Sequence, residues 1–146
     1  LDRCRSRSGG GLMPIELSYL SASVALLFIM LGAEAVTGNL QYNTKDLLGA
    51  RDEMAAPNAM VGRCKRATQN MLESLAMFAP LVLIAVLAER TNSLTALGSA
   101  IFFWSRVAYA PTYWFGIPVI RTLVWFGGIA GIVLVFLQVL PFSGAA

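Results

Sequence analysis

The chain has 146 residues, of which 57% are hydrophobic and only 13% are charged, and its formal net charge is +3. A soluble domain carries about a quarter charged residues, so this composition, with a mean hydropathy of +0.66, indicates a membrane protein without a separate soluble domain. The dense basic face of a nucleic-acid binder is missing, and the lack of histidine excludes His-based acid–base catalysis and His-ligated metal sites.

Residues 1–12 form a basic, Gly-rich tail, and Met13 before Pro14 is a candidate natural start, which would make the tail an added segment. Residues 13–146 are predicted to form one all-α membrane domain, a bundle of four transmembrane helices. Each of four apolar stretches reaches the roughly 20 residues that a membrane span needs. They are Ile15 to about Val36, Arg63 to Ala88, Leu94 to Phe115, and Val119 to Leu140.

The connections between these stretches differ in length and charge. Residues 38–62 form a long polar loop, residues 89–93 a short one, and residues 116–118 a tight turn. The basic residues gather at the first and third connections: Lys45, Arg51, Arg63, Lys65, Arg66 and Arg121. The positive-inside rule therefore predicts that these two connections are cytoplasmic and that both termini lie outside.

The second stretch begins with a polar stripe. Arg63, Arg66, Asn70 and Glu73 follow one another at three- and four-residue steps, which places them on one helical face. Snorkelling to the membrane interface is enough to explain Arg63. Glu73 follows the start of the apolar run at Met71, so it requires a partner or a polar cavity.

A second stripe lies on the third stretch, where Arg106, Tyr109 and Tyr113 also share one face. Tyrosines are common at the membrane interface, but Arg106 lies inside an apolar run and requires a partner. Glu73 is the predicted carboxylate partner of Arg106. Arg121 opens the fourth stretch, either as an interfacial anchor or as part of the same cluster.

Taken together, these stripes bring arginines, a carboxylate, an amide and phenols to one side of the membrane. Arginine pairs well with carboxylates, and fixed positive charge stabilises an anion that develops during a reaction. The cluster therefore favours binding of an anionic ligand that makes several hydrogen bonds.

Two segments resemble signatures of one membrane-protein family. The segment from Arg66 through Asn70 to Glu73 reads R-A-x-x-N-x-x-E, and the segment from Arg106 to Tyr113 reads R-x-x-Y-x-x-x-Y. Both resemble the MAPEG family, the membrane-associated proteins in eicosanoid and glutathione metabolism. The resemblance covers about Ile15 to Leu140, and the stretch from Tyr109 to Trp125 is most similar to the bacterial branch.

The resemblance implies a homotrimer of four-helix bundles in the bacterial inner membrane, with glutathione as co-substrate, no metal, and membrane lipids around it. It implies a glutathione transferase or peroxidase that acts on a hydrophobic electrophile or lipid. The residues that would bind glutathione are Arg66, Asn70, Glu73, Arg106, Tyr109 and Tyr113. Arg121 would be the catalytic residue that stabilises the thiolate.

The chain departs from the family pattern in two places. The eicosanoid branch has an arginine near the end of its first helix, where this chain has Glu34, Thr37 and Asn39, and Arg121 follows Tyr113 by eight residues rather than seven. A non-catalytic protein of the same fold that binds a lipid or partner is therefore an alternative. A small multidrug transporter, with Glu16 or Glu34 as its carboxylate, and a two-cysteine redox enzyme, with Cys4 and Cys64, are further alternatives.

Overall fold

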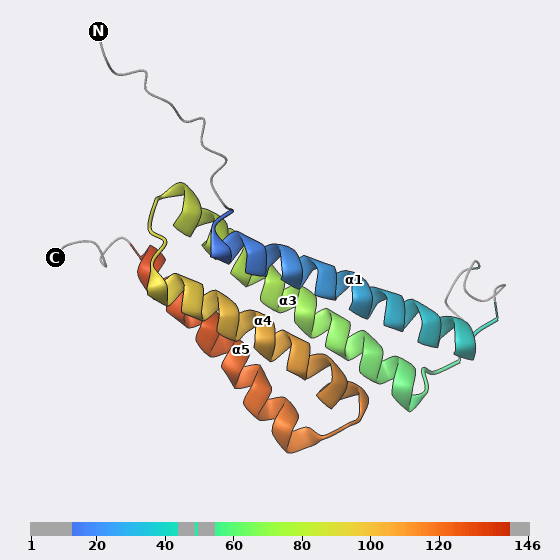
Figure 1. The fold of residues 1–146 in the computed structure, drawn as a ribbon. Coiled ribbons are helices and arrows are strands. Elements are labelled where there is room, and N and C mark those ends of the chain that lie inside the picture. The colour runs from blue at the N-terminus through green and yellow to red at the C-terminus, as the bar shows by residue number, and fades with distance from the viewer. Residues whose placement is uncertain (1–12, 44–48, 50–54, 141–146) are drawn as a thin grey trace, which may run out of the picture.

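The computed structural model describes residues 13–43, 49 and 55–140. Within this part of the chain the regular structure is entirely helical and consists of α1 (Ile15–Gln41), α3 (Ala59–Leu87), α4 (Ser93–Trp114) and α5 (Pro118–Val139). The helices run up and down as an antiparallel bundle (Figure 1). The predicted all-α four-helix fold is thereby confirmed. The basic tail and most of the charged residues of the first loop lie outside the described residues.

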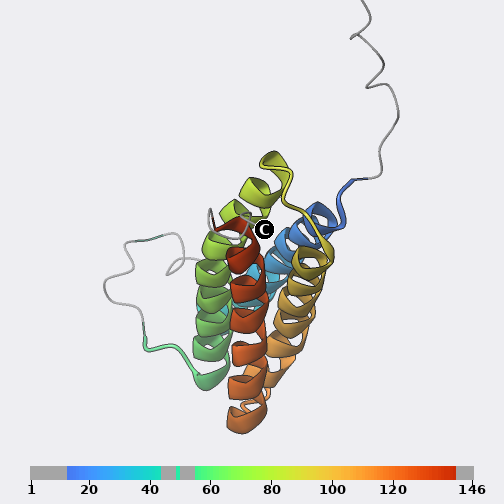
Figure 2. The same ribbon diagram turned by 90° about the vertical axis from the view of Figure 1, so that its left-hand side faces the viewer.

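The helices are arranged as a four-cornered bundle. Figure 2 shows α3, α5 and α4 across the front, with α1 behind them. Both α1 and α5 contact α3 and α4. As a result, α3 and α4 each lie between α1 and α5 and also contact one another. The segments that carry the two predicted polar stripes therefore face each other.

Three of the four helices, α1, α3 and α5, are long and apolar enough to cross a membrane. The fourth, α4, has 22 residues, which gives a length of about 33 Å at the usual rise per residue. It lies along α5 over this length (Figure 1). Polar residues inside α4, among them Arg106, keep its apolarity over the length of a membrane span below that of the other three helices.

The helix ends follow local capping signals. Asn58 caps α3 by accepting a hydrogen bond from the Val61 amide at 2.9 Å, and Asn92 forms a capping box with Thr95 at the start of α4. Gly116, with a φ of +72°, follows the end of α4, and Pro118 occupies the first position of α5.

The predicted bounds of the last two helices agree with these ends to within a residue or two. Two other bounds differ. The first helix continues past Val36 to Gln41, and the second begins at Ala59 rather than Arg63.

The side chain of Gln41 connects the first two helices. Its amide nitrogen donates to the carbonyl of Ala56 at 3.0 Å, and its amide oxygen accepts from the backbone N–H of Asn58 at 2.8 Å. Because Asn58 is the residue that caps α3, the end of α1 fixes where α3 begins.

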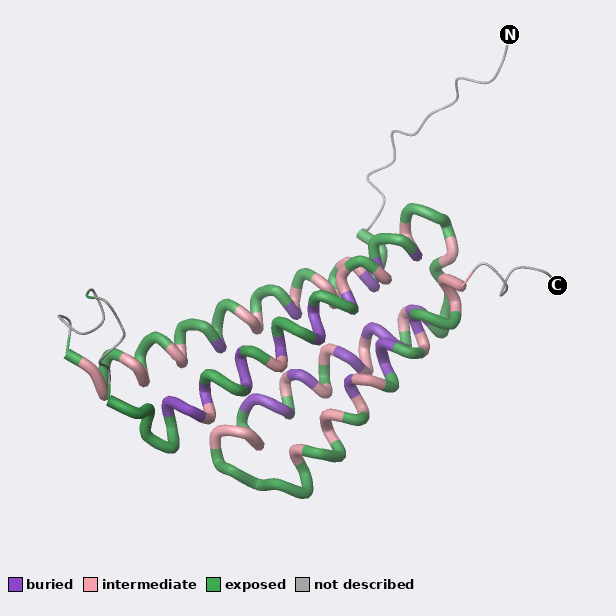
Figure 3. Tube along the Cα trace, turned by 180° about the vertical axis from the view of Figure 1, so that it is seen from behind, coloured by how far each residue is buried: buried purple, intermediate pink, exposed green. Residues whose placement is uncertain are grey.

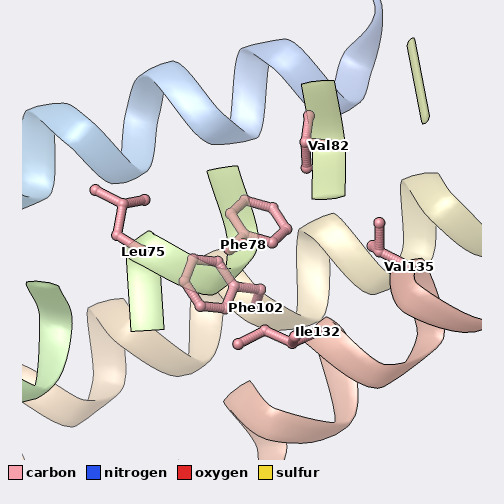
Figure 4. Packing of buried hydrophobic residues seen from close by; sticks show 6 residues of the cluster. All are labelled: Leu75, Phe78, Val82, Phe102, Ile132 and Val135. Carbon is pink, nitrogen blue, oxygen red and sulfur yellow. The ribbon is translucent and has the colours of Figure 1, made fainter. Parts of the chain in front are cut away.

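The core divides into two clusters along the bundle, and buried residues lie along the facing sides of the helices (Figure 3). The first cluster consists of Leu75, Phe78, Val82, Phe102, Ile132 and Val135. Figure 4 shows these side chains converging from α3, α4 and α5. The rings of Phe78 and Phe102 stack with their centroids 4.0 Å apart. The second cluster, Met30, Ala67, Met71, Tyr109 and Ala110, lies nearer the α4–α5 turn.

Helices α4 and α5 approach one another most closely at two glycines. A Cβ atom added to Gly131 would lie 2.6 Å from the carbonyl oxygen of Gly98, and one added to Gly98 would lie 2.8 Å from the carbonyl oxygen of Gly131. Small residues at a helix crossing allow this backbone contact in a membrane bundle. The glycine pair therefore sets the spacing of α4 and α5 beside the first core cluster.

A buried carboxylate lies at the same end of the bundle. Glu16 is only 4% exposed, and its Oε1 accepts a hydrogen bond from the Thr95 hydroxyl at 2.6 Å. Thr95 belongs to the capping box of α4, so Glu16 places a carboxylate near the positive end of that helix.

Candidate functional site

The predicted site residues lie on three helices that meet at one end of the bundle. The first half of α3, the last turns of α4 and the first turns of α5 come together at the end that holds the first and third connections (Figure 1). An up-and-down bundle requires this arrangement, because alternate connections lie at the same end.

Tyr113 joins two of the arginines. The Arg66 Nε donates to the Tyr113 hydroxyl at 3.0 Å, and the guanidinium carbon of Arg121 lies 4.9 Å from the centroid of the same ring. This is a cation–π contact. Gly62 lies one turn before Arg66, and a Cβ atom there would come within 3.2 Å of Arg66 Nη1. Arg66 from α3 and Arg121 from α5 are thus held at one aromatic ring on α4.

Tyr109 extends the cluster into the bundle. Its ring centroid lies 5.4 Å from that of Tyr113 and 5.3 Å from the guanidinium carbon of Arg106. Tyr109 is buried, whereas Tyr113 is only partly covered. The two tyrosines share one face of α4, as their spacing predicted, and they connect the exposed Arg66 and the partly exposed Arg121 to the buried Arg106.

Arg106 is 1% exposed and is bonded to oxygens of the neighbouring helices. Its Nη1 donates to Asn70 Oδ1 on α3 at 2.7 Å, and its Nη2 donates to the Trp125 carbonyl on α5 at 3.4 Å. Its guanidinium carbon lies 5.5 Å from the ring centroid of Phe102. The buried arginine therefore bridges all three helices of the site.

The predicted pairing of Arg106 with Glu73 is wrong. The Oε1 of Glu73 instead accepts a hydrogen bond from Gln69 Nε2 at 3.0 Å, and Glu73 is exposed on the surface of the protomer. The amide of Asn70 lies one turn before Glu73 and faces Arg106 instead. Six of the seven predicted site residues form one connected cluster, and Glu73 lies beside it on the same face of α3.

Two residues that sequence reasoning did not identify shape the site. Gly128 lies against Arg106, and a Cβ atom at this position would come within 2.7 Å of the guanidinium carbon. A glycine pair inside the apolar fourth stretch was a detectable sign of such close approach. Arg63, interpreted as an interfacial anchor, donates to the Trp114 carbonyl at 3.2 Å and thus ties the end of α4 to α3.

The residues behind two of the alternative functions form no common site among the described residues. Cys64 is 1% exposed, and Cys4 lies outside the described residues, so the geometry offers no support for a redox pair. Glu16 is buried against Thr95 at the end of the bundle remote from the cluster. Glu34, in contrast, lies in the second half of α1 and is partly exposed.

Comparison of the chain with curated proteins and with solved structures returned no significant match. The model of the MAPEG family, however, matches residues 19–141. This range includes α3, α4 and α5 in full, most of α1, and all seven residues of the site. The chain therefore belongs to the MAPEG family, the helical membrane proteins of eicosanoid and glutathione metabolism.

Proposed function

We propose that this chain is a membrane-bound glutathione transferase or peroxidase that activates the glutathione thiol for attack on a hydrophobic electrophile. The observation that carries the proposal is the placement of Arg66 and Arg121 at the ring of Tyr113. Neither guanidinium is neutralised by a carboxylate of the described residues. Two uncompensated positive charges at one polar site favour a ligand with several negative charges, such as glutathione.

Arg121 is the proposed catalytic residue. A free thiol has a pKa of about 8.5, and a nearby arginine lowers it by favouring the thiolate. The ionised sulfur is the nucleophile, so a larger thiolate fraction at neutral pH raises the rate of attack. Arg121 lies at the start of α5 and is partly exposed, and four neighbouring residues of the same helix, Pro118, Val119, Thr122 and Leu123, line a shallow apolar depression. A hydrophobic electrophile dissolved in the bilayer would reach the sulfur from this side.

We also propose that the protein is a homotrimer whose glutathione sites lie between subunits. Arg66, Gln69 and Glu73 are exposed on one side of α3 although they adjoin a membrane span. Polar groups at membrane depth require protein or water rather than lipid around them. Native mass spectrometry in detergent should therefore give three times the mass of one chain, and a monomer at all protein concentrations would contradict this assembly.

The proposed function is tested by separating binding from thiolate formation. Arg121→Ala should lower the rate of glutathione conjugation by about 10²–10³, as expected for one lost charge-assisted contact to an anion, and should reduce thiolate absorbance. Glutathione binding should change much less, because Arg66 and Asn70 remain. Arg66→Ala should have the opposite profile and lose binding first. Calorimetry with glutathione and stopped-flow absorbance of the thiolate measure the two quantities.

Arg90→Ala is the matched control for loss of an arginine. Arg90 donates to the Leu140 carbonyl at 2.7 Å, at the opposite end of the bundle, so this variant should keep both binding and thiolate formation. If Arg121→Ala forms the thiolate as well as the wild type does, Arg121 is an interfacial anchor and the catalytic assignment falls.

One observation favours a second candidate function, a non-catalytic protein of the same fold. No lysine or arginine occurs in α1, so the first helix brings no positive charge to the site. A protein that binds a lipid or a partner protein would not need a positive charge on its first helix. Saturable glutathione binding without thiolate formation in the wild type would support this second function over the first.

A further inference from the structure

The hydrogen bond between Arg106 and Asn70 determines which way the Asn70 amide faces. A guanidinium group has only donors, so the atom of Asn70 that faces Arg106 Nη1 at 2.7 Å must be the carbonyl oxygen. The amide nitrogen then points away from Arg106. Asn70 is partly exposed, and no acceptor for its Nδ2 exists among the residues that the structure describes. The Asn70 side chain therefore has its amide N–H donors free to bind a ligand, while its oxygen is directed to Arg106.

Arg106 itself is too deeply covered to offer its charge to a ligand at the protomer surface. Its side chain is 1% exposed, and its Nε is buried without a hydrogen bond in the described part of the chain. Burial of a guanidinium without a carboxylate costs free energy. The arrangement is therefore expected to serve a purpose other than stability.

The surroundings of Arg106 hold the guanidinium in one position. Phe102 and Tyr109 lie within cation–π distance of it, at 5.5 Å and 5.3 Å. On α5, Gly128 provides space that any larger residue would fill, and the Trp125 carbonyl accepts from Nη2. Because these contacts come from the bundle interior, the guanidinium position does not depend on the ligand.

We propose that Arg106 is a positioning residue, which holds the Asn70 carbonyl oxygen so that the Asn70 NH2 group donates to an acceptor oxygen of glutathione. This inference rests on the proposed glutathione function and changes the expected role of Arg106 from ligand contact to support of a ligand contact. Side chains held by a second layer of hydrogen bonds lose less entropy when they bind. Without Arg106, either the oxygen or the nitrogen of the Asn70 amide could face the ligand, and ordering the side chain would reduce the binding free energy.

A double-mutant cycle tests whether Arg106 acts through Asn70. Arg106→Met removes the buried donor without leaving a charge, and Asn70→Ala removes the ligand contact. Each single variant should weaken glutathione binding by about tenfold, as is typical of one hydrogen bond to a charged group. If Arg106 acts through Asn70, the double variant should also be weakened by only about tenfold, because the second change removes nothing further. Effects that multiply to about a hundredfold would mean that Arg106 binds glutathione independently and would overturn the inference.

A second variant gives an independent result if Arg106→Met does not fold. Asn70→Asp replaces the amide by a carboxylate that pairs with Arg106 but has no donor for the ligand. Its thermal midpoint in detergent should equal or exceed that of the wild type, whereas its glutathione affinity should fall at least about tenfold. Unchanged affinity in this variant would contradict the inference.

Ser99→Ala is the matched control on α4. The Ser99 hydroxyl is buried without a hydrogen-bond partner in the described chain, so its removal should leave affinity unchanged and should not lower the thermal midpoint. If the wild type shows no saturable glutathione binding at millimolar concentrations, both the proposed function and this inference fall. If the wild type binds and the cycle is multiplicative, only the inference fails.

Discussion

At the end of the bundle where α1 begins, α4 and α5 touch backbone to backbone at Gly98 and Gly131. Toward the opposite end the side chain of Arg106 lies between the same two helices, against Gly128. Two glycines of α5, less than one turn apart, thus have different uses. One brings helices together, and the other makes room for a buried charge.

The buried ionisable groups of the two ends differ in the same way. Glu16 is bonded to a threonine that already caps α4, so its contacts are completed within the fold. Arg106 is bonded to the side-chain oxygen of Asn70, a partly exposed residue whose amide nitrogen has no hydrogen bond within the described chain. The Glu16 carboxylate is therefore bonded within the fold, whereas the cluster at the other end leaves an amide donor and positive charge available for a ligand.

The largest expected effect is on the free energy of unfolding and comes from loss of the aromatic stack between Phe78 and Phe102. Phe78 is fully buried and stacks on Phe102. Phe78→Ala should lower the free energy of unfolding by about 3–5 kcal/mol, because it removes a buried ring and leaves a cavity. Glutathione affinity, measured by calorimetry at a temperature where the variant is folded, should fall by less than the loss of about tenfold expected for removal of Arg106 itself, because Phe78 reaches Arg106 only through Phe102. A large loss of affinity would mean that the two ends are not separable.

The two glycines of α5 give a smaller but more selective effect. In Gly131→Ala the new methyl group meets the Gly98 carbonyl, which cannot move aside, so unfolding free energy should fall by about 1–3 kcal/mol with affinity kept. In Gly128→Ala the methyl group meets Arg106, whose side chain must shift and release Asn70. This variant should lose glutathione affinity by about tenfold, as for one hydrogen bond. Thermal unfolding and calorimetry on the same samples measure both quantities.

Gly32→Ala is the control for both glycine variants. A Cβ atom added at Gly32 meets nothing within 4 Å, so the substitution should only improve helix propensity, by about 0.5–1 kcal/mol. If Gly128→Ala keeps its glutathione affinity while Gly131→Ala loses it, the different roles assigned to the two glycines are wrong.

Hydrophobicity alone predicted the number and order of the helices, because a membrane span needs a long apolar run that is easy to detect. It did not predict where α1 ends and α3 begins. The helical backbone of α1 continues beyond its apolar run through Thr37 and Asn39, and Asn58 caps α3 ahead of the apolar run of that helix. Capping and the Gln41 contacts, rather than apolarity, decide these ends.

The site was predicted as two stripes but not as a set of contacts. Periodicity places Asn70 and Glu73 on one face of α3, yet it does not reveal how that face is rotated toward α4. A rotation of less than one turn decides whether the amide or the carboxylate meets Arg106, and here it is the amide. Arg66, Tyr113 and Arg121 come from three helices, and their contact follows from tertiary packing that no local pattern encodes.

Entry of α4 into the membrane depends on the helices around it. An arginine near the middle of a lone helix opposes insertion by about 2.5–3.5 kcal/mol, and α4, although as long as α5, does not reach the apolarity that marks α1, α3 and α5 as spans. In the folded bundle Asn70 on α3 and the Trp125 carbonyl on α5 accept hydrogen bonds from that arginine. Since α3 is synthesised before α4 and α5 after it, one of these two acceptors is available only once α5 has emerged. The short turn between Trp114 and Pro118 keeps α4 and α5 together, so we expect the unit that enters the bilayer to be a helical hairpin rather than a single helix.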